Sequence, residues 1–321
     1  MYIWPGIVAL LLSASAGPAL AESRYPERSI RLIVGFPAGS AIDSAARLIA
    51  PRLAEALRQP VVVEDAPGAA GNVALDRVVR APADGYTFAI ATSGQIIINP
   101  SLYRLSYDPT SALAPISKLV ASANLLVVPR ASPASTLRDL IVLAKAQPGA
   151  LTYASGGIGS SPHLAGALLC SMAGLDIRHI PYKGVIAALP DLLAERLTMM
   201  FSPAPIVLPA IRDGRLRVLA TTSSTRISLL PDVPTVAESG LPGFEVVVWF
   251  GILAPAGTPA AIIGRLERET ANVLGMAIVR DKLADLGMDV IGSSPEQFAA
   301  AITSETSFWA EVIRRERMKP E

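Results

Sequence analysis

One pattern occurs twice in this chain: an apolar strand-like run, a turn rich in glycine and serine, a helix-like segment and a second strand-like run. The first occurrence has its apolar run at residues 30–36, its turn at 37–40 and helical apolar spacing from 45 to 57. The second has residues 151–154, a turn over 155–161 and a helix over 162–173. Alternating strands and helices predict a parallel sheet covered by helices. Since the occurrences lie about 120 residues apart, we expect two lobes of similar topology.

The rest of the chain predicts further elements and two crossings between the lobes. Strands are expected at residues 61–63, 87–91, 177–180 and 246–253, and helices at 73–80, 185–194, 259–274, 277–286 and 295–314. If the C-terminal third packs back on the first lobe, the chain crosses near residues 121–128 and 245–253. We therefore expect residues 22–122 with 249–321 to form one lobe and residues 123–248 to form the other. A chain of 321 residues is long enough for two such cores.

The charge balance restricts the kind of partner. There are 28 basic and 27 acidic residues, a net charge of +1. A nucleic-acid partner would need a basic stripe, so this balance argues against one. A small anionic ligand remains compatible, because it needs only local dipoles.

The N-terminal segment resembles an export signal. Residues 1–21 carry no charged side chain, contain an apolar run at 7–12 and end in Ala19-Leu20-Ala21. The apolar run is too short to span a bilayer, and the A-x-A ending is typical of signal-peptide cleavage sites. We expect residues 1–21 to be a signal peptide and the mature protein to be periplasmic. The missing Lys or Arg before the apolar run leaves an uncleaved apolar N-terminus as the alternative.

Each glycine–serine turn lies directly before a predicted helix, where it could hold an anion. The first N–H groups of a helix have no internal partner, and the helix dipole is positive there. Glycine permits close backbone approach, and serine can cap the helix or donate to the anion. A purely structural role is the alternative, since Ser40 with Asp43 three residues later also forms a loose capping box.

Enzyme and metal motifs do not emerge. The turn at residues 156–161 lacks the G-x-S-x-G and G-x-G-x-x-G spacings, and the chain contains no P-loop. One cysteine, Cys170, allows no internal disulfide, and two histidines supply few metal ligands, so no cofactor is expected. His163 is interpreted as a loop-orienting or ligand-contacting residue. Lys183 could meet an anion or lie on the surface.

Many ordered stretches resemble the receptors of tripartite tricarboxylate transporters, the Bug family. They include Phe36-Pro37-Ala38-Gly39, Pro67-Gly68-Ala69, Asp84-Gly85-Tyr86-Thr87, Asn99-Pro100-Ser101-Leu102-Tyr103, Tyr153-Ala154-Ser155, Pro181-Tyr182-Lys183-Gly184, Pro231-Asp232-Val233-Pro234-Thr235, Trp249-Phe250-Gly251 and Ala254-Pro255-Ala256-Gly257. The resemblance covers nearly the whole mature chain. It implies a two-lobed α/β periplasmic-binding-protein (Venus-flytrap) fold, in which each lobe is a mixed, mostly parallel sheet flanked by helices.

The resemblance also implies a ligand carboxylate held between the two turns. The candidate ligand-binding residues are Pro37, Ala38, Gly39, Ser40, Ala41, Ile42, Asp43, Ser93, Gly157, Ile158, Gly159, Ser160, Ser161, His163, Lys183 and Ser202. Relatives often have polar residues at 42 and 158 and Asp at 202. Ile42 and Ile158 therefore predict a monocarboxylate with an apolar or aromatic body, unless both isoleucines point into the lobe cores.

These features together predict a monomeric, non-enzymatic receptor for a small organic acid. It would deliver the acid to the membrane permease of a tripartite tricarboxylate-type transporter. A ligand sensor acting on a signalling partner, or an enzyme on the same scaffold, are the alternatives.

Overall fold

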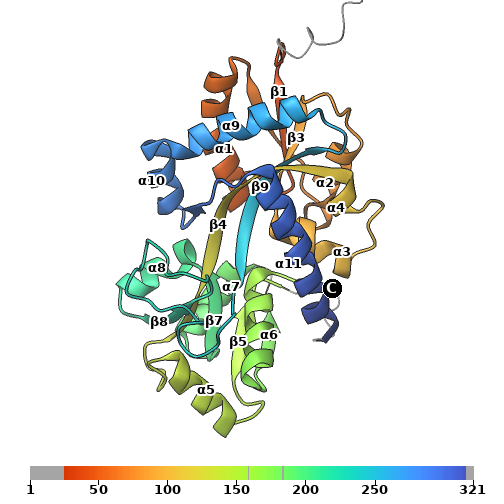
Figure 1. The fold of residues 1–321 in the computed structure, drawn as a ribbon. Coiled ribbons are helices and arrows are strands. Elements are labelled where there is room, and N and C mark those ends of the chain that lie inside the picture. The colour runs from red at the N-terminus through yellow and green to blue at the C-terminus, as the bar shows by residue number, and fades with distance from the viewer. Residues whose placement is uncertain (1–24, 158, 183, 316–321) are drawn as a thin grey trace, which may run out of the picture.

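The computed structural model describes residues 25–157, 159–182 and 184–315. It has two lobes, one above the other in Figure 1, connected by long strands. The expected signal peptide lies outside the described residues. Within the described ranges, no helix combines the length and the apolarity needed to cross a membrane.

Each lobe contains one three-stranded parallel unit. In the first, β1 (Ile30–Val34) lies between β2 (Val61–Asp65) and β3 (Thr87–Thr92). In the second, β5 (Thr152–Ser155) lies between β6 (Arg178–Pro181) and β7 (Met199–Pro203). Helices connect these strands: α1 (Ala41–Leu57) and α2 (Asn72–Val79) in the first lobe, and α6 (Ser161–Ala173) and α7 (Val185–Leu193) in the second. The expected two-lobed α/β fold is confirmed.

Antiparallel strands connect the two units. The 17-residue β4 (Leu113–Pro129) pairs with β9 (Val247–Pro255) along residues 113–123, and with β7 and β8 (Leu216–Thr221) along residues 124–129. The strand thus changes sheets between Ala123 and Asn124. β9 also pairs with β3, and the short β10 (Asp289–Val290) pairs with β4. The sequence pattern did not predict β4, β7 or β8 as strands. The crossing expected at residues 121–128 lies within β4, and the one expected at residues 245–253 overlaps the start of β9.

The remaining helices complete the two lobes. The second lobe also contains α5 (Leu137–Ala146) and α8 (Ala204–Arg212). Between β3 and β4 lie the π-helical turn η4 (Gly94–Ile98) and the short α3 (Asn99–Leu102) and α4 (Pro109–Ala112), and η3 (Ala69–Gly71) precedes α2. The C-terminal third forms α9 (Ala260–Gly275), α10 (Ala277–Asp285) and α11 (Pro295–Arg315). Figure 1 shows α9 beside α1, and α11 descending along the joint between the lobes.

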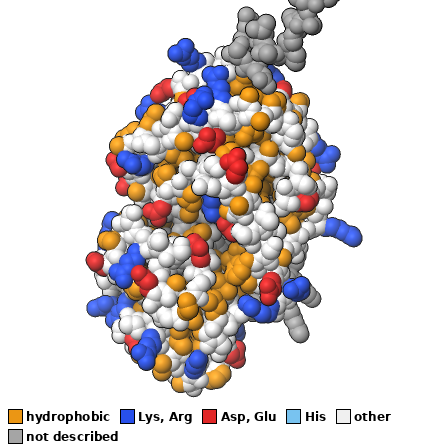
Figure 2. All heavy atoms as spheres, in the orientation of Figure 1, with side chains coloured by type: hydrophobic (Ala, Val, Ile, Leu, Met, Phe, Trp, Pro, Cys, Tyr) orange, Lys and Arg blue, Asp and Glu red, His pale blue; other side chains and the backbone are white. Residues whose placement is uncertain are grey.

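Apolar burial follows the amphipathic patterns of the sequence. α1 buries Ile42, Ile49 and Leu53 against β1, β3 and the C-terminal helices. A separate cluster packs α7 and α8 against strands of the second lobe, and a larger one extends through both lobes and includes Trp249 and Trp309. On the surface, Figure 2 shows basic and acidic side chains interspersed over this face. The cores thus fix β1, β5 and the helices that follow them.

Candidate ligand-binding site

The first glycine–serine turn connects β1 to α1 and is closed by two reciprocal hydrogen bonds. Gly39 has φ of +80°, a left-handed conformation that glycine adopts readily. The Ser40 hydroxyl accepts from the Asp43 N–H (3.4 Å), and the Asp43 carboxylate accepts from the Gly39 N–H (2.7 Å). Asp43 therefore holds the turn together. The N–H groups of Ala41 and Ile42 belong to the first turn of α1, whose donors have no partner within the helix.

The second turn, between β5 and α6, has the same backbone geometry, with His163 in the position that Asp43 has in the first turn. Gly159 has φ of +78°, and Ser160 has φ −68° and ψ 152°, close to the −67° and 161° of Ser40. The Gly159 N–H donates to Nδ1 of His163 (3.1 Å), as Gly39 donates to its carboxylate partner. The Ser160 hydroxyl donates to the Gly157 carbonyl (2.6 Å). His163 thus orients the loop, one of its two predicted roles.

His163 is held in a stack of three aromatic rings below this turn. Its ring centroid lies 4.2 Å from that of His179, which in turn lies 4.8 Å from that of Tyr153. His179 Nε2 is 2.7 Å from the Ser155 hydroxyl, which also bonds the Gly157 backbone. Burial lowers the pKa of both histidines to about 4, and for His179 the neighbouring His163 adds to the effect. Both rings are therefore neutral at pH 7, so they bring no positive charge to the turn.

The two turns contribute to one cavity of about 470 Å³ between the lobes. Of the candidate residues, those that line it are Ser40, Ala41, Ile42, Ser93, Gly159, Ser160 and Ser161. Residues from the joint between the lobes and from α11 complete its wall. The lining residues that the sequence analysis did not select are Phe36, Ala70, Thr92, Gly94, Gln95, Ile97, Ile98, Asn99, Leu102, Tyr103, Gly156, Leu164, Val246, Val247, Val248, Phe250 and Trp309.

Other candidate residues do not line this cavity. They are Pro37, Ala38, Gly39, Asp43, Gly157, His163 and Ser202. Ser202 is fully buried in β7, where its hydroxyl donates to the Pro203 carbonyl (3.1 Å). Ile158 and Lys183 lie outside the described residues. Ile42 is only 2% exposed and packs in the first core, so it reaches the cavity with a small part of its surface.

A third segment, which follows β3, contributes Ser93 and several lining residues that were not predicted. Gln95 is 1% exposed; its amide accepts from the Thr92 N–H (2.9 Å) and donates to the Gly71 carbonyl (2.9 Å). The Asn99 amide similarly donates to the Ala70 carbonyl (3.2 Å). These two amides fix the backbone that faces the cavity. Serine and glycine follow β3 as they follow β1 and β5, and this signal could have extended the prediction from Ser93 to the rest of the segment.

Residues 246–248 reach the cavity because hydrogen bonds connect the start of β9 to β4. The Val246 N–H donates to the Thr222 carbonyl (2.8 Å), and the Thr222 hydroxyl donates to the Val246 carbonyl (2.6 Å). That hydroxyl also accepts from the Asn124 N–H (2.9 Å). The Asn124 side chain donates to the Ser161 hydroxyl at the start of α6. The joint between the lobes and the second turn are therefore parts of one polar network.

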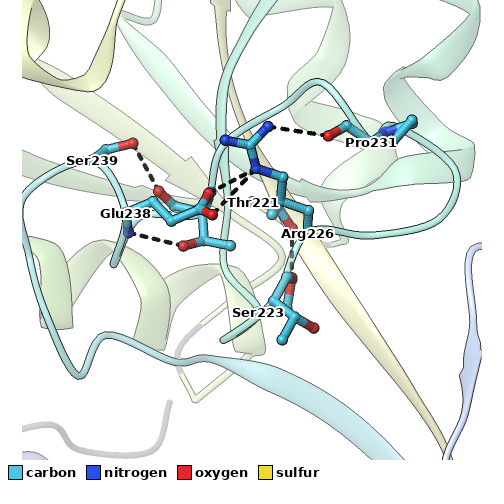
Figure 3. A network of polar contacts seen from close by, with 8 residues as sticks. Thr221, Ser223, Arg226, Pro231, Glu238 and Ser239 are labelled. Carbon is cyan, nitrogen blue, oxygen red and sulfur yellow. Dashed lines mark hydrogen bonds and ion pairs between the residues drawn. The ribbon is translucent and has the colours of Figure 1, made fainter.

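The irregular segment that precedes Val246 has a polar network of its own (Figure 3). The Arg226 guanidinium bonds the Glu238 carboxylate (2.9 Å) and the Pro231 carbonyl (3.3 Å). Glu238 also accepts from the Thr235 N–H (2.8 Å), and Ser239 donates to the Thr235 carbonyl (2.7 Å). These bonds hold the segment in place although it has no regular secondary structure. They thereby fix the position at which β9 begins.

The electrostatics of the cavity come from backbone dipoles. None of the described residues that line it carries a charge. The N-termini of α1 and α6 meet at this cavity, and each is equivalent to a partial positive charge. Most other lining side chains are aliphatic or aromatic. Such a cavity suits one anionic group attached to an apolar body.

Comparison with known proteins decides the family. The model of the tripartite tricarboxylate transporter family receptor matches residues 45–318. The chain belongs to this family of receptors. The receptor is 36% identical to a UPF0065 protein from the tcbD-tcbE intergenic region of Pseudomonas sp. strain P51, over 97% of this chain and 93% of that one. It is also 36% identical to protein BugT of Bordetella pertussis, over 93% and 92% of the two chains.

Solved structures of similar proteins share the fold of the receptor. Rpa4515 of Rhodopseudomonas palustris, solved with adipate, is 35% identical, with a TM-score of 0.78 over 93% of this chain and all of that one. MatC from the same organism, with bound malate, is 31% identical, with a TM-score of 0.74 over 90% of this chain and all of that one. A structure described as periplasmic binding protein BugD is 31% identical, with a TM-score of 0.74 over 92% and 100% of the two chains.

Proposed function

We propose that the receptor binds a small organic monocarboxylate in the cavity between its lobes and releases it unchanged. The carboxylate would lie between the starts of α1 and α6. Its donors would be the N–H groups of Ala41, Ile42 and Ser161 and the hydroxyls of Ser40 and Ser161. Each helix start contributes roughly 0.3–1 kcal/mol, and up to ~2 kcal/mol where it is partly buried.

The observation that carries this proposal is an uncharged cavity at which two helix N-termini of matching geometry meet. The apolar residues that line the cavity, more than Ile42 alone, indicate that the body of the ligand is apolar. Phe36, Phe250 and Trp309 provide aromatic surface, and residues 246–248 are three valines. A second carboxylate against this wall would lose its hydration without a charged partner among the described lining residues, which is costly. The relatives solved with adipate and malate support an organic acid as the ligand.

The proposed division of the chain places this cavity at a joint that can move. We assign residues 22–122 with 249–321 to one lobe and residues 123–248 to the other. The change of sheet at Ala123 and the start of β9 at Val247 support these boundaries. Ligand that contacts both lobes would favour the closed arrangement through its greater affinity for that state.

Family membership supports the cellular role. We propose that residues 1–21 direct export, that the mature protein is periplasmic and monomeric, and that it passes its ligand to a tripartite transporter permease. The family is defined by that transporter, and the BugD relative is described as periplasmic.

Calorimetry tests the ligand class. Purified receptor is titrated with benzoate, phenylacetate, citrate and aspartate, and the recovered acid is analysed by chromatography. We expect one of the two aromatic monocarboxylates to bind at least about tenfold more tightly than citrate or aspartate, equivalent to ~1.4 kcal/mol, and to be recovered intact. Tighter binding of citrate or aspartate would refute the apolar-body proposal, and conversion of the acid would indicate an enzyme.

A further inference from the structure

A second cavity of about 290 Å³ lies next to the ligand cavity. We call it the rear cavity; it is lined by Lys118, Gly243, Glu245, Val247, Ser304, Glu305, Phe308 and Trp309. Among the described residues, only Val247 and Trp309 line both cavities. The indole of Trp309, which is 7% exposed, is by far the larger of the two side chains. It therefore forms most of the side-chain wall that the two cavities share.

The position of Trp309 is fixed by contacts of Glu305, which lies one helical turn earlier on α11. Glu305 precedes it by four residues, so both side chains lie on the same face of α11. The Glu305 carboxylate accepts from the Trp249 indole N–H (2.7 Å) and pairs with the Lys118 ammonium (3.0 Å). The Lys118 side chain is 14% exposed and that of Glu305 28%. The ion pair ties α11 to β4 and the hydrogen bond ties it to β9, and these contacts hold Trp309 where it lines both cavities.

The two cavities differ in chemistry. The described lining residues of the ligand cavity carry no charge, whereas the rear cavity has one ammonium group, of Lys118, and two carboxylates, of Glu245 and Glu305. Since Lys118 is paired with Glu305, Glu245 leaves one excess negative charge; its carboxylate accepts a hydrogen bond only from Ser224 among the described residues (2.9 Å). An apolar or hydrogen-donating group could enter this space, but a second carboxylate would be repelled.

We propose that Trp309 is a specificity-determining residue that sets the size limit of the ligand. The inference rests on the proposed monocarboxylate function and names the group that ends the cavity. With the indole in place, an acid must fit within the ligand cavity. Shortening the side chain joins the two cavities and admits longer acids whose far end carries no negative charge.

The test compares two acids on three forms of the full-length protein. Phenylacetate and 6-phenylhexanoate are titrated into wild type, Trp309→Leu and Phe308→Leu. Phe308 is the matched control, because it neighbours Trp309 on α11 and lines only the rear cavity. We expect wild type to favour phenylacetate, and Trp309→Leu to shift the affinity ratio toward 6-phenylhexanoate by about tenfold or more. In Phe308→Leu the ratio should stay within about threefold of wild type.

Other outcomes separate this inference from the proposed function. If wild type binds neither of these acids nor benzoate, the proposed function fails. If wild type binds phenylacetate and folded Trp309→Leu keeps the wild-type ratio, the role of Trp309 is refuted. Should the leucine variant lose its native circular dichroism, Trp309→Phe must shift the ratio in the same direction, and an unchanged ratio there also refutes the proposal. Suberate is a dicarboxylate of comparable length. Its affinity for Trp309→Leu relative to wild type should increase less than that of 6-phenylhexanoate, and an equal increase would contradict the charge argument.

Discussion

Replacing Gly39 or Gly159 by alanine should distinguish two effects: backbone strain within each turn and contact between the lobes. Gly39 and Gly159 have nearly the same left-handed φ, +80° and +78°. A Cβ at Gly39 would have no heavy atom within 4 Å beyond its chain neighbours. A Cβ at Gly159 would lie 2.9 Å from a terminal methyl group of Leu102. Leu102 ends α3 in the first lobe and Gly159 precedes α6 in the second, so only one substitution disturbs the contact between lobes.

Backbone strain and the contact with Leu102 occur in different states of the protein, so they change the free energy of unfolding and the ligand affinity differently. An L-residue in the left-handed region costs roughly 1–2 kcal/mol in both variants. Because that strain is present with and without ligand, it lowers the free energy of unfolding but cancels from ligand affinity. Overpacking costs about 1–3 kcal/mol, and the flexible end of Leu102 places this contact near the lower value. If the contact forms only on closure, Gly159→Ala should weaken binding by roughly fivefold, equivalent to ~1 kcal/mol.

Calorimetry with the ligand acid measures ligand affinity, and urea unfolding measures the free energy of unfolding. Both are applied to each member of a double-mutant cycle. Gly39→Ala and Gly159→Ala should lose similar unfolding free energy, but only Gly159→Ala should lose affinity. Leu102→Ala removes the obstructing methyl group, so adding it to Gly159→Ala should restore most of the loss after correction for the effect of Leu102→Ala alone. Equal affinity losses in the two glycine variants, or no coupling between Gly159 and Leu102, would refute this reasoning.

Two further predictions concern pH and processing. Burial lowers the pKa of His163 and His179 to about 4 in the folded protein, below the ordinary value of 6.5, so the unfolded chain takes up protons first and stability should fall as pH drops from about 6.5 towards 4. Urea unfolding at pH 7 and pH 5 should show a smaller pH-dependent loss in His163→Gln than in wild type, and an equal loss would exclude this source. N-terminal sequencing of protein exported by its host should begin near Glu22, and a sequence beginning at Met1 would contradict cleavage.

Several candidate residues lie in the two turns, but their local roles depend on contacts between distant residues. The sequence places Asp43 and His163 at equivalent positions, three residues after the serine that precedes each helix. It does not show that His163 accepts from the Gly159 N–H as Asp43 accepts from Gly39. The His163 ring also stacks on His179, which stacks on Tyr153, and these two residues come from the neighbouring strands β6 and β5. Ile42 likewise packs mainly in the core, because the register of α1 turns it toward β1.

Local sequence patterns predicted the parallel β1, β2 and β3, the pair β5 and β6, and the turns that follow β1 and β5, because apolar periodicity and glycine–serine chemistry act over a few neighbouring residues. The repeat itself predicted two lobes, and the family resemblance added the binding-protein fold with the ligand between them. Only the tertiary structure decided the wall of the ligand cavity. Residues 246–248 and Trp309 reach it because β4 changes sheets at Ala123 and because the Lys118–Glu305 pair places α11. Those contacts join residues more than 100 positions apart, and their geometry depends on how complete strands and helices pack, which no local pattern specifies.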